Sequence, residues 1–210
     1  MEVKLVSITP KAEETIAFCA RRSSSNPTNP EYKQLLTYCL KHKHWSIFEQ
    51  ASASFEIVTS RAIGRQLLRH RSFCFQEFSQ RYSNNIAFEF IEPRRQAEKN
   101  RQASIDDLDD STRQWFIYTL NALQEFAQRA YTSARNRGIA KESARFLLPE
   151  SSQTNLIMTG NLRSWIHYIQ VRTDEETTQK EHRDIAMKIK QHLAKELPTI
   201  AEILHWSEPC

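Results

Sequence analysis

The scarcity of glycine is the feature that most limits how this chain can fold. Only three glycines occur in 210 residues, Gly64, Gly138 and Gly160, and they stand far apart. The dinucleotide-binding loop of the Rossmann fold and the phosphate-binding P-loop both need several glycines within a few residues. These two routes to a nucleotide are therefore excluded, and side chains must provide most of the contacts to any nucleotide that binds.

The spacing of apolar residues predicts both strands and helices. Apolar residues that alternate with polar ones indicate a strand, because successive side chains of a strand point to opposite faces. Strands are predicted at residues 1–8, 51–59, 86–90 and 154–159. Apolar residues that recur every three or four positions indicate a helix. Helices are predicted at residues 9–20, 29–43, 60–70, 111–138, 140–148 and 161–172, with a final helical region around 185–197.

Local signals set the expected ends of these helices. Thr9-Pro10 and Asn29-Pro30 are typical helix starts, and Ser111 to Gln114 fits a capping box. The charged stretch 94–110 is expected to be a loop or an irregular helix. We predict the α+β fold class, with a mixed β-sheet core, several flanking helices, helix as the dominant element, and a single domain over residues 1–210.

Charge and hydropathy narrow the possible functions. The net charge of +4, from 29 Lys and Arg against 25 Asp and Glu, is too small to make nucleic acid the default partner. No apolar run reaches the roughly 18 residues that a membrane span needs. Residues 1–8 also lack the apolar core of a signal peptide. We therefore expect a cytoplasmic protein that binds neither nucleic acid nor a membrane.

The cysteines and histidines do not form a metal-binding pattern. The four cysteines are widely separated, without the close pairs of a zinc site or a redox motif. His42 and His44 stand two residues apart with no third ligand nearby. No metal site is predicted, and the thiols are expected to be reduced.

An arginine row suggests an anionic ligand. Arg61, Arg65 and Arg69 recur every four residues and would share one face of the helix predicted at residues 60–70. Like charges at this spacing repel, so the row persists more readily if an anion lies against it. A solvated basic face is the alternative interpretation of these three residues.

The residues that follow favour the anionic ligand. Arg69-His70-Arg71 is followed, after seven residues, by Ser79-Gln80-Arg81. This compact segment combines guanidinium groups, an imidazole and a hydroxyl. Such groups bind phosphates and the planar edges of nucleobases well.

This segment resembles the signature of the flavin-dependent thymidylate synthases, which is Arg-His-Arg, seven variable residues and Ser. Other landmarks of that family occur in order and at compatible separations. They are His44 with Ser46 and Glu49, Gln66, Arg145, Asn161, Arg163, His167 and Arg172. The resemblance thus runs from about residue 44 to residue 172. Two departures are mild: Gln80 stands where some members have glycine, and His167 where others have asparagine.

The resemblance implies a reaction and its participants. It implies conversion of dUMP to dTMP, with 5,10-methylenetetrahydrofolate as carbon donor, FAD as redox carrier and NADPH as its reductant. Because the flavin supplies the redox chemistry, the protein has to bind the substrates, orient them and polarise the reacting groups. Members of the family are homotetramers whose active sites combine residues of several subunits, and the same is expected here.

The resemblance also implies the roles of individual residues. The residues that match the family's dUMP-binding positions are Gln66, Arg69, Glu77, Ser79, Gln80, Arg81, Arg145 and Arg172. FAD is held by His44, Ser46, Arg69, His70, Arg71, Glu77, Asn161, Arg163 and His167. Arg172 is the residue that activates the substrate, since a fixed cation lowers the pKa of a neighbouring group and favours the N3-deprotonated pyrimidine.

No protein nucleophile is expected. Cys74, the only cysteine inside the signature, falls at a variable position and is interpreted as a packing residue. Ser79 has no adjacent His or Asp in the sequence that would deprotonate it, so it is assigned to nucleotide contact. The electron-rich ring would then react without attack by the enzyme.

Two other classes of function compete with this interpretation. One is a nucleic-acid-binding protein whose arginine row neutralises phosphates, and the other is a structural helical protein with a basic face. Neither explains the ordered landmarks. The remaining residues of note are interpreted as structural: Arg94, Arg95 and Arg101 as a solvated run, His182, His192 and His205 as surface groups, and Trp115, Trp165 and Trp206 as core or interface residues.

Overall fold

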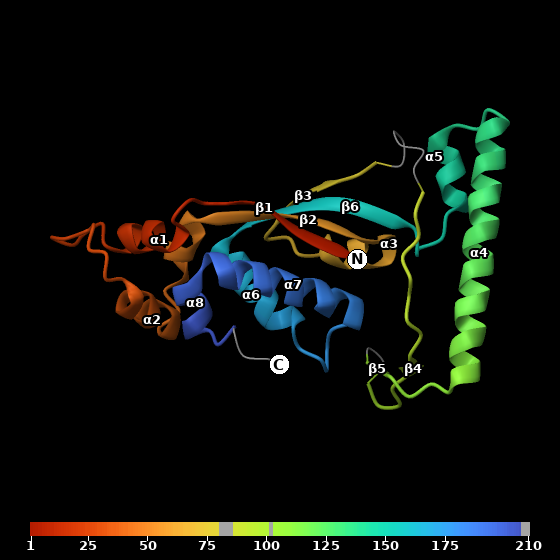
Figure 1. The fold of residues 1–210 in the computed structure, drawn as a ribbon. Coiled ribbons are helices and arrows are strands. Elements are labelled where there is room, and N and C mark those ends of the chain that lie inside the picture. Colours follow the sequence, from red (N-terminus) through yellow and green to blue (C-terminus); the bar gives the residue numbers. More distant parts are fainter. Residues whose placement is uncertain (80–85, 101–102, 207–210) are drawn as a thin grey trace.

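A four-stranded sheet organises the chain (Figure 1), which the computed structural model describes over residues 1–79, 86–100 and 103–206. The strand order is β1-β2-β6-β3, formed by Glu2–Ile8, Ser52–Ser60, Gln153–Asn161 and Cys74–Glu77. All three pairings between neighbouring strands are antiparallel. The α+β class is thus confirmed, but the sheet is antiparallel rather than mixed.

Helices cover one face of this sheet and lie at both of its ends (Figure 1). The helices on the covered face are α6 (Leu162–Arg172), α7 (Lys180–Glu196) and α8 (Pro198–Ile203). One end carries α1 (Ala12–Ala20), α2 (Lys33–Lys41) and the 3-10 helix η1 (Trp45–Gln50). The other end carries α4 (Asp110–Asn136), α5 (Lys141–Ala144) and the 3-10 helix η2 (Arg145–Leu147), while α3 (Arg61–Leu67) follows β2 directly. Among the described residues, no helix combines the length and apolarity that a membrane crossing requires.

The core lies between the sheet and α6. Trp165 is fully buried there, and its ring meets Phe73 and Phe55 edge-on, at centroid distances of 4.5 and 5.0 Å. Its indole Nε1 donates to the carbonyl of Ala53, 3.1 Å away, so the one polar atom of the ring is satisfied. This contact fixes α6 against β2, which confirms the interpretation of Trp165 as a core residue.

Several helix ends differ from their predicted positions. Asp109 rather than Ser111 caps α4, accepting a hydrogen bond from the backbone N–H of Thr112. Thr9 does not cap α1, because its hydroxyl and backbone bond to Ser52 in β2. The helix predicted to reach residue 70 ends at Leu67, so Arg69 lies beyond the helical face expected for the arginine row.

The stretch 94–110 is also different from the prediction. It contains a small antiparallel hairpin, in which β4 (Arg95–Gln96) pairs with β5 (Ser104–Ile105). The strand predicted at residues 86–90 is reduced to a single bridge between Phe88 and Ser152. Alternating residues form a strand only where another segment pairs with them, and of residues 86–90 only Phe88 has such a partner, Ser152, in a distant part of the sequence.

Gly160 allows close packing in the core. It pairs with Ala53 in the sheet, and a methyl group at its Cα would overlap the ring of Phe73. Phe73 in turn packs on Trp165. A glycine is therefore required where β6 passes this aromatic cluster.

We predict that Gly160→Ala destabilises the protein by about 1–3 kcal/mol, because a rigid aromatic ring has to move. The penalty should be smaller when Phe73 is also replaced by Leu, which leaves room for the added methyl group. Chemical denaturation of the two single variants and the double variant gives the interaction energy between positions 160 and 73. The contact would be contradicted if Gly160→Ala lowered the free energy of unfolding equally with Phe73 and with Leu at position 73.

Candidate active site

The centre of the candidate site is a hydrogen bond between Arg172 and His70. His70 lies in the turn after α3, and Arg172 is the last residue of α6. The Nε–H of Arg172 donates to Nε2 of His70 over 3.0 Å. Burial, followed by the positive charges of Arg172 and His167, lowers the pKa of His70 to about 4. A neutral imidazole can accept this hydrogen bond, so the charge and the geometry agree.

A second layer of side chains lies behind this pair. His182, in the first turn of α7, is fully buried, and its Nδ1 lies 3.3 Å from Oε1 of Gln66. Nε2 of Gln66 donates to Oε1 of Gln179 over 2.7 Å. The ring of the buried Tyr168 stands 5.0 Å from that of His70 and 5.7 Å from that of His182, measured between centroids. The prediction that His182 is a surface group was wrong.

Burial controls the ionisation of this second layer. It lowers the pKa of His182 to about 3, with smaller effects from the charges of Arg172 and His70. Burial also raises the pKa of the Tyr168 hydroxyl, which Arg172 opposes only in part. Both groups are therefore neutral at physiological pH, and Arg172 provides a positive charge beside them.

The sequence does carry a signal for His182 and Tyr168. His182 precedes Ile185 and Ile189 by three and seven residues, which places it on the buried face of α7. Tyr168 follows Trp165 by three residues on the buried face of α6. Reading each polar residue against the apolar stripe of its own helix would have identified both as core positions.

A groove beside the centre brings three predicted flavin residues together. Asn161, Arg163 and His167 line it, along with residues of η1 and of the turn after His70, and its volume is about 570 Å³. The Oδ1 of Asn161 caps α6 by accepting from the N–H of Ser164, and Arg163 pairs with Glu49. The first turn of α6 therefore faces both the groove and η1.

The remaining predicted residues surround this region or lie elsewhere. His44 and Ser46 are exposed at the start of η1, and Arg69 and Arg71 are exposed on either side of His70. Glu77, at the end of β3, accepts a hydrogen bond from the hydroxyl of Thr154 over 2.6 Å. Ser79 follows it and is half-buried. Gln80 and Arg81 lie outside the described residues.

Arg145 is separated from the centre within one chain. It begins η2, and its guanidinium lies 5.8 Å above the ring of Phe146. The neighbouring Ala144 packs with Tyr131 and Ala134 of α4 in a hydrophobic cluster of its own. Figure 1 shows α5 beside α4 and away from α6. A single chain therefore does not bring Arg145 to Arg172.

One other prediction about a single residue was wrong, because Cys74 is exposed on β3 rather than packed in the core. Of the tryptophans predicted to be core or interface residues, Trp206 is buried, whereas Trp115 on α4 is 64% exposed, which leaves the interface as its predicted place.

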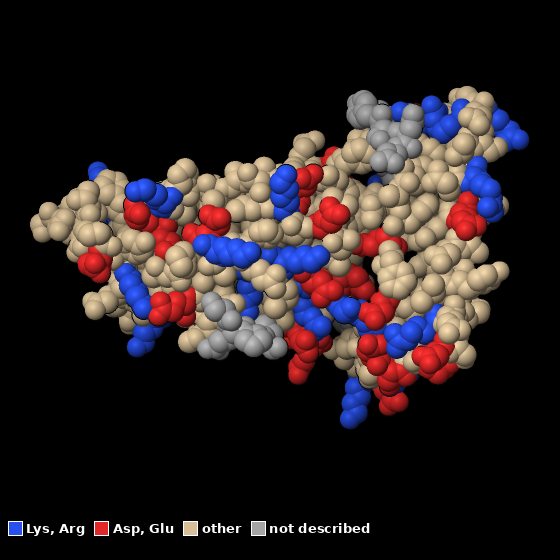
Figure 2. Space-filling model, in the orientation of Figure 1, with Lys and Arg blue, Asp and Glu red and all other residues tan. Residues whose placement is uncertain are grey.

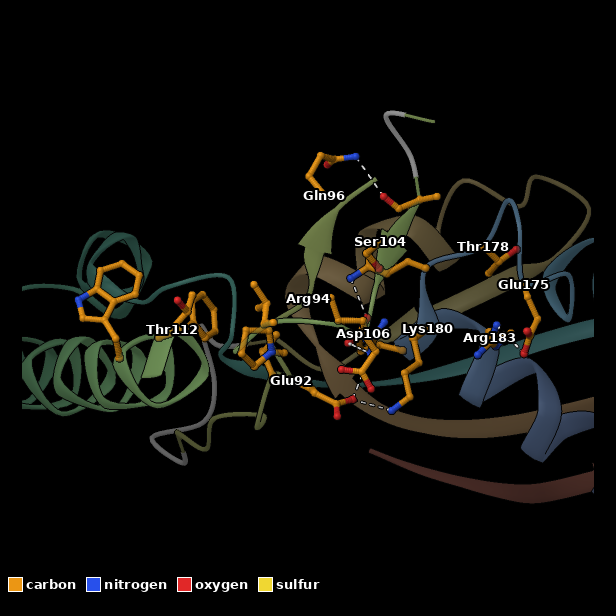
Figure 3. Close-up of a pocket in the computed structure, with 18 residues that line it drawn as sticks. Glu92, Arg94, Gln96, Ser104, Asp106, Thr112, Glu175, Thr178, Lys180 and Arg183 are labelled. Carbon is orange, nitrogen blue, oxygen red and sulfur yellow. Dashed lines mark hydrogen bonds and ion pairs between the residues drawn. The ribbon is translucent and has the colours of Figure 1, made fainter. Parts of the chain in front are cut away.

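A second cavity, shown in Figure 3, adjoins the candidate site, because Gln179 in its wall accepts a hydrogen bond from Gln66. Its volume is about 750 Å³, and its wall is formed by residues from 91–96 and 103–108, the start of α4 and the segment 175–183. Arg94 pairs there with Glu92 and Glu181, and Lys180 pairs with Glu92. The Arg94 side chain is only 10% exposed, so it does not belong to a solvated run as predicted. These ion pairs connect the segment after β3 to the start of α7.

Acidic and basic side chains are mixed in the same region of the surface. Figure 2 shows them interspersed around the β4–β5 hairpin and the start of α4. Arg95 pairs there with Asp107, and Arg113 with Asp106. Within residues 1–79, 86–100 and 103–206, no three His, Cys, Asp or Glu side chains form a group that could hold a metal ion.

Comparison with known proteins identifies the family. The family model described as thymidylate synthase complementing protein, Thy1, matches residues 4–199. The chain belongs to the Thy1 family. The family expected from the Arg-His-Arg signature is thereby confirmed.

Curated relatives match this Thy1 chain along nearly its whole length. It is 48% identical over 216 residues to the flavin-dependent thymidylate synthase of Synechocystis sp., covering 98% of this chain and 100% of the relative. It is 45% identical over 220 residues to the probable flavin-dependent thymidylate synthase of Paramecium bursaria Chlorella virus 1, with the same coverage.

A solved structure has the same fold as this Thy1 chain. A crystal structure of the UMP/dUMP methylase PolB from Streptomyces cacaoi, bound with 5-Br dUMP, matches with a TM-score of 0.86 and 24% identity. The match covers 97% of this chain and 94% of that chain.

The two neutral histidines predict how the stability of this Thy1 chain depends on pH. Their pKa values of about 4 and 3 are below the ordinary value of 6.5, so the unfolded chain binds protons that the folded chain does not. The free energy of unfolding should therefore be highest above pH 6.5 and fall as the pH decreases towards 4. Each such histidine adds a slope of about 1.4 kcal/mol per pH unit in this range.

This pH dependence can be measured by chemical denaturation between pH 4.5 and 7.5, which covers most of the interval between the shifted pKa of His70, about 4, and the ordinary value of 6.5. His70→Gln keeps an acceptor for Arg172 but does not titrate. It should therefore reduce the slope by about 1.4 kcal/mol per pH unit, which corresponds to one proton. A slope that His70→Gln does not alter would contradict the assigned pKa.

Proposed function

We propose that this Thy1 protein is a flavin-dependent thymidylate synthase. It is a transferase of the methyltransferase class that converts dUMP to dTMP in deoxynucleotide biosynthesis. 5,10-methylenetetrahydrofolate is the carbon donor and NADPH the reductant. The observation that carries the proposal is the Arg172–His70 hydrogen bond beside Gln66, in a chain 48% identical to a protein of that name. The UMP/dUMP methylase with the same fold supports a pyrimidine nucleotide as substrate.

In this proposal Arg172 acts on the pyrimidine as a fixed cation. Its Nε–H is held by His70, which leaves the two terminal guanidinium nitrogens for the ligand. A cation beside N3 lowers the pKa of that nitrogen and favours the deprotonated, electron-rich ring. His70 contributes by remaining neutral, because a protonated imidazole could not accept from Arg172.

FAD fits the groove beside this centre. A guanidinium, an imidazole and an amide line a space of about 570 Å³, which is within the range of about 300–1,000 Å³ typical of cofactor sites. When bound, FAD carries the reducing equivalents from NADPH to the reaction. The residues assigned to it are His44, Ser46, Arg69, His70, Arg71, Glu77, Asn161, Arg163 and His167.

The nucleotide contacts are assigned around Arg172. They come from Gln66, Arg69, Glu77, Ser79, Gln80, Arg81, Arg145 and Arg172. Several arginines suit a nucleotide, since guanidinium groups pair with phosphate in a bidentate manner. No cysteine nucleophile is assigned, because the electron-rich ring provides its own nucleophilic carbon.

The active enzyme is proposed to be a homotetramer with shared active sites. Helix α5, which directly precedes Arg145, lies away from α6 within one chain (Figure 1), so in this proposal a second subunit supplies Arg145. An apolar face of α4 supports such an assembly, because Trp115, Tyr118, Leu123 and Phe126 are each more than half exposed. Exposed apolar residues gathered on one face of a helix mark interaction sites.

The proposal extends to the organisation and the location of the chain. Residues 1–210 act as a single domain, which the family match over residues 4–199 supports. The enzyme works in the cytoplasm, and this is supported by Cys19, Cys39 and Cys74, which are free thiols.

The proposed function predicts turnover of dUMP by the FAD-loaded wild type in the presence of NADPH and methylenetetrahydrofolate. Arg172→Ala should lower turnover by about 100-fold or more, because the cation that polarises the ring is lost. The absorption spectrum should show that FAD stays bound to this variant. Arg22→Ala, at an exposed arginine of the opposite end of the fold, is the matched control and should retain activity. Normal activity of Arg172→Ala would contradict the role of this residue.

The shared site predicts that assembly and activity depend on α4. Light scattering of the wild type should give four times the chain mass of 24.6 kDa. Phe126→Glu should dissociate the tetramer, since it places a charge in an apolar interface, and should abolish turnover. Gln34→Glu, on the exposed face of α2, should change neither. A monomer with full activity would contradict the shared site.

A further inference from the structure

We propose that His182 is a positioning residue for the nucleotide site, which it serves by fixing the orientation of the Gln66 amide. This inference rests on the proposed function, in which Gln66 contacts the pyrimidine nucleotide. His182 itself lies behind Gln66 in the core, and it acts on the ligand only through that side chain.

The contacts of the Gln66 amide define how it is held. Its Oε1 faces Nδ1 of His182 at 3.3 Å, and its Nε2 donates to Oε1 of Gln179 at 2.7 Å. A carbonyl oxygen can only accept, so Nδ1 of His182 has to carry the proton. The neutral imidazole therefore has its hydrogen on Nδ1 and a lone pair on Nε2.

These two contacts prevent the amide from rotating by half a turn. In the flipped orientation, the oxygen of Gln66 would face the oxygen of Gln179, whose own amide is held by its hydrogen bond to Glu181. The NH₂ group of Gln66 would face Nδ1 of His182, which could accept only if the imidazole proton moved to Nε2, a buried atom with no partner among the described residues. Each end of the amide still has one hydrogen-bonding position left for a ligand, because NH₂ carries two donors and oxygen two lone pairs. His182, together with Gln179, thus determines which end of Gln66 offers a donor and which an acceptor.

The cost of burying His182 argues against a purely structural role. It lies on the same face of α7 as Ile185 and Ile189, where an apolar side chain would pack without a polar atom to satisfy. Its Nε2 is buried and has no hydrogen-bond partner among the described residues. An unsatisfied buried polar atom is unfavourable, and such exceptions concentrate at functional sites.

The position of His182 also connects Gln66 to the Arg172 centre. The ring of His182 meets that of His70 edge-on at a centroid distance of 5.9 Å, and His70 accepts from Arg172. Tyr168 packs against both imidazoles. The two groups assigned to the pyrimidine, Gln66 and Arg172, are therefore oriented by neighbouring histidines that share one buried wall.

The test compares two replacements of His182 in the FAD-loaded enzyme. His182→Leu fills a similar space but cannot donate, so the KM for dUMP should rise about tenfold with kcat changed much less. In His182→Asn, the amide nitrogen can stand where Nδ1 stood and restore the donor, so most of the KM should recover. The flavin spectrum should be the same in both variants.

Double variants separate positioning from loss of fold. If His182 acts through Gln66, then His182→Leu should have no further effect on the KM in a Gln66→Ala background. An unchanged KM in His182→Leu, equal defects in the Leu and Asn variants, or additive effects with Gln66→Ala would each overturn the inference. A wild type that does not convert dUMP would instead contradict the proposed function itself.

Discussion

The pairing of β2 with β6 is the constraint on which the rest of the structure depends. The two strands pair over nine residues each, from Ser52 opposite Asn161 to Ser60 opposite Gln153. Because they are antiparallel, α3 starts at one end of the pair and α6 at the other. Helix α6 then runs back beneath the sheet for 11 residues, about 16 Å, until Arg172 reaches the turn that follows α3. Residues that are 102 positions apart thereby form one hydrogen bond.

The sequence predicts those parts of this arrangement that depend on local patterns. The alternation in residues 51–59, the run from Asn161 to Arg172 and the long helix ending before Gly138 are all present in the structure. These elements have one buried face and clear end signals, so their own residues determine them. The Arg-His-Arg signature, together with the other landmarks that occur in order and at compatible separations, was sufficient to identify the family.

The parts that were not predicted depend on contacts between distant segments. His182 is buried because α7 covers the turn that carries His70, and Arg94 is buried because Glu181 approaches it across the chain. An exception is the local pairing of Arg95–Gln96 with Ser104–Ile105, which was missed because this charged stretch has no apolar alternation. The apolar stripe of α7 indicates that His182 is buried, but nothing near His182 or Arg94 in the sequence reveals which residues they contact. For the same reason, the separation of Arg145 from Arg172 could not be deduced from the order of the motifs.

The hydrogen bond from Arg172 to His70 has a consequence for which side chains can stand at position 172. The guanidinium uses Nε inside the protein and keeps its two terminal nitrogens for the outside, so one side chain has an anchored part and a working part. Lysine has the same charge but only one nitrogen, at the end of a flexible stem. If that single ammonium donated to His70, lysine would have no second nitrogen and no planar pair of donors for the ligand. Position 172 therefore requires more than a positive charge. It requires a side chain that can donate to His70 with one nitrogen and to the ligand with two others.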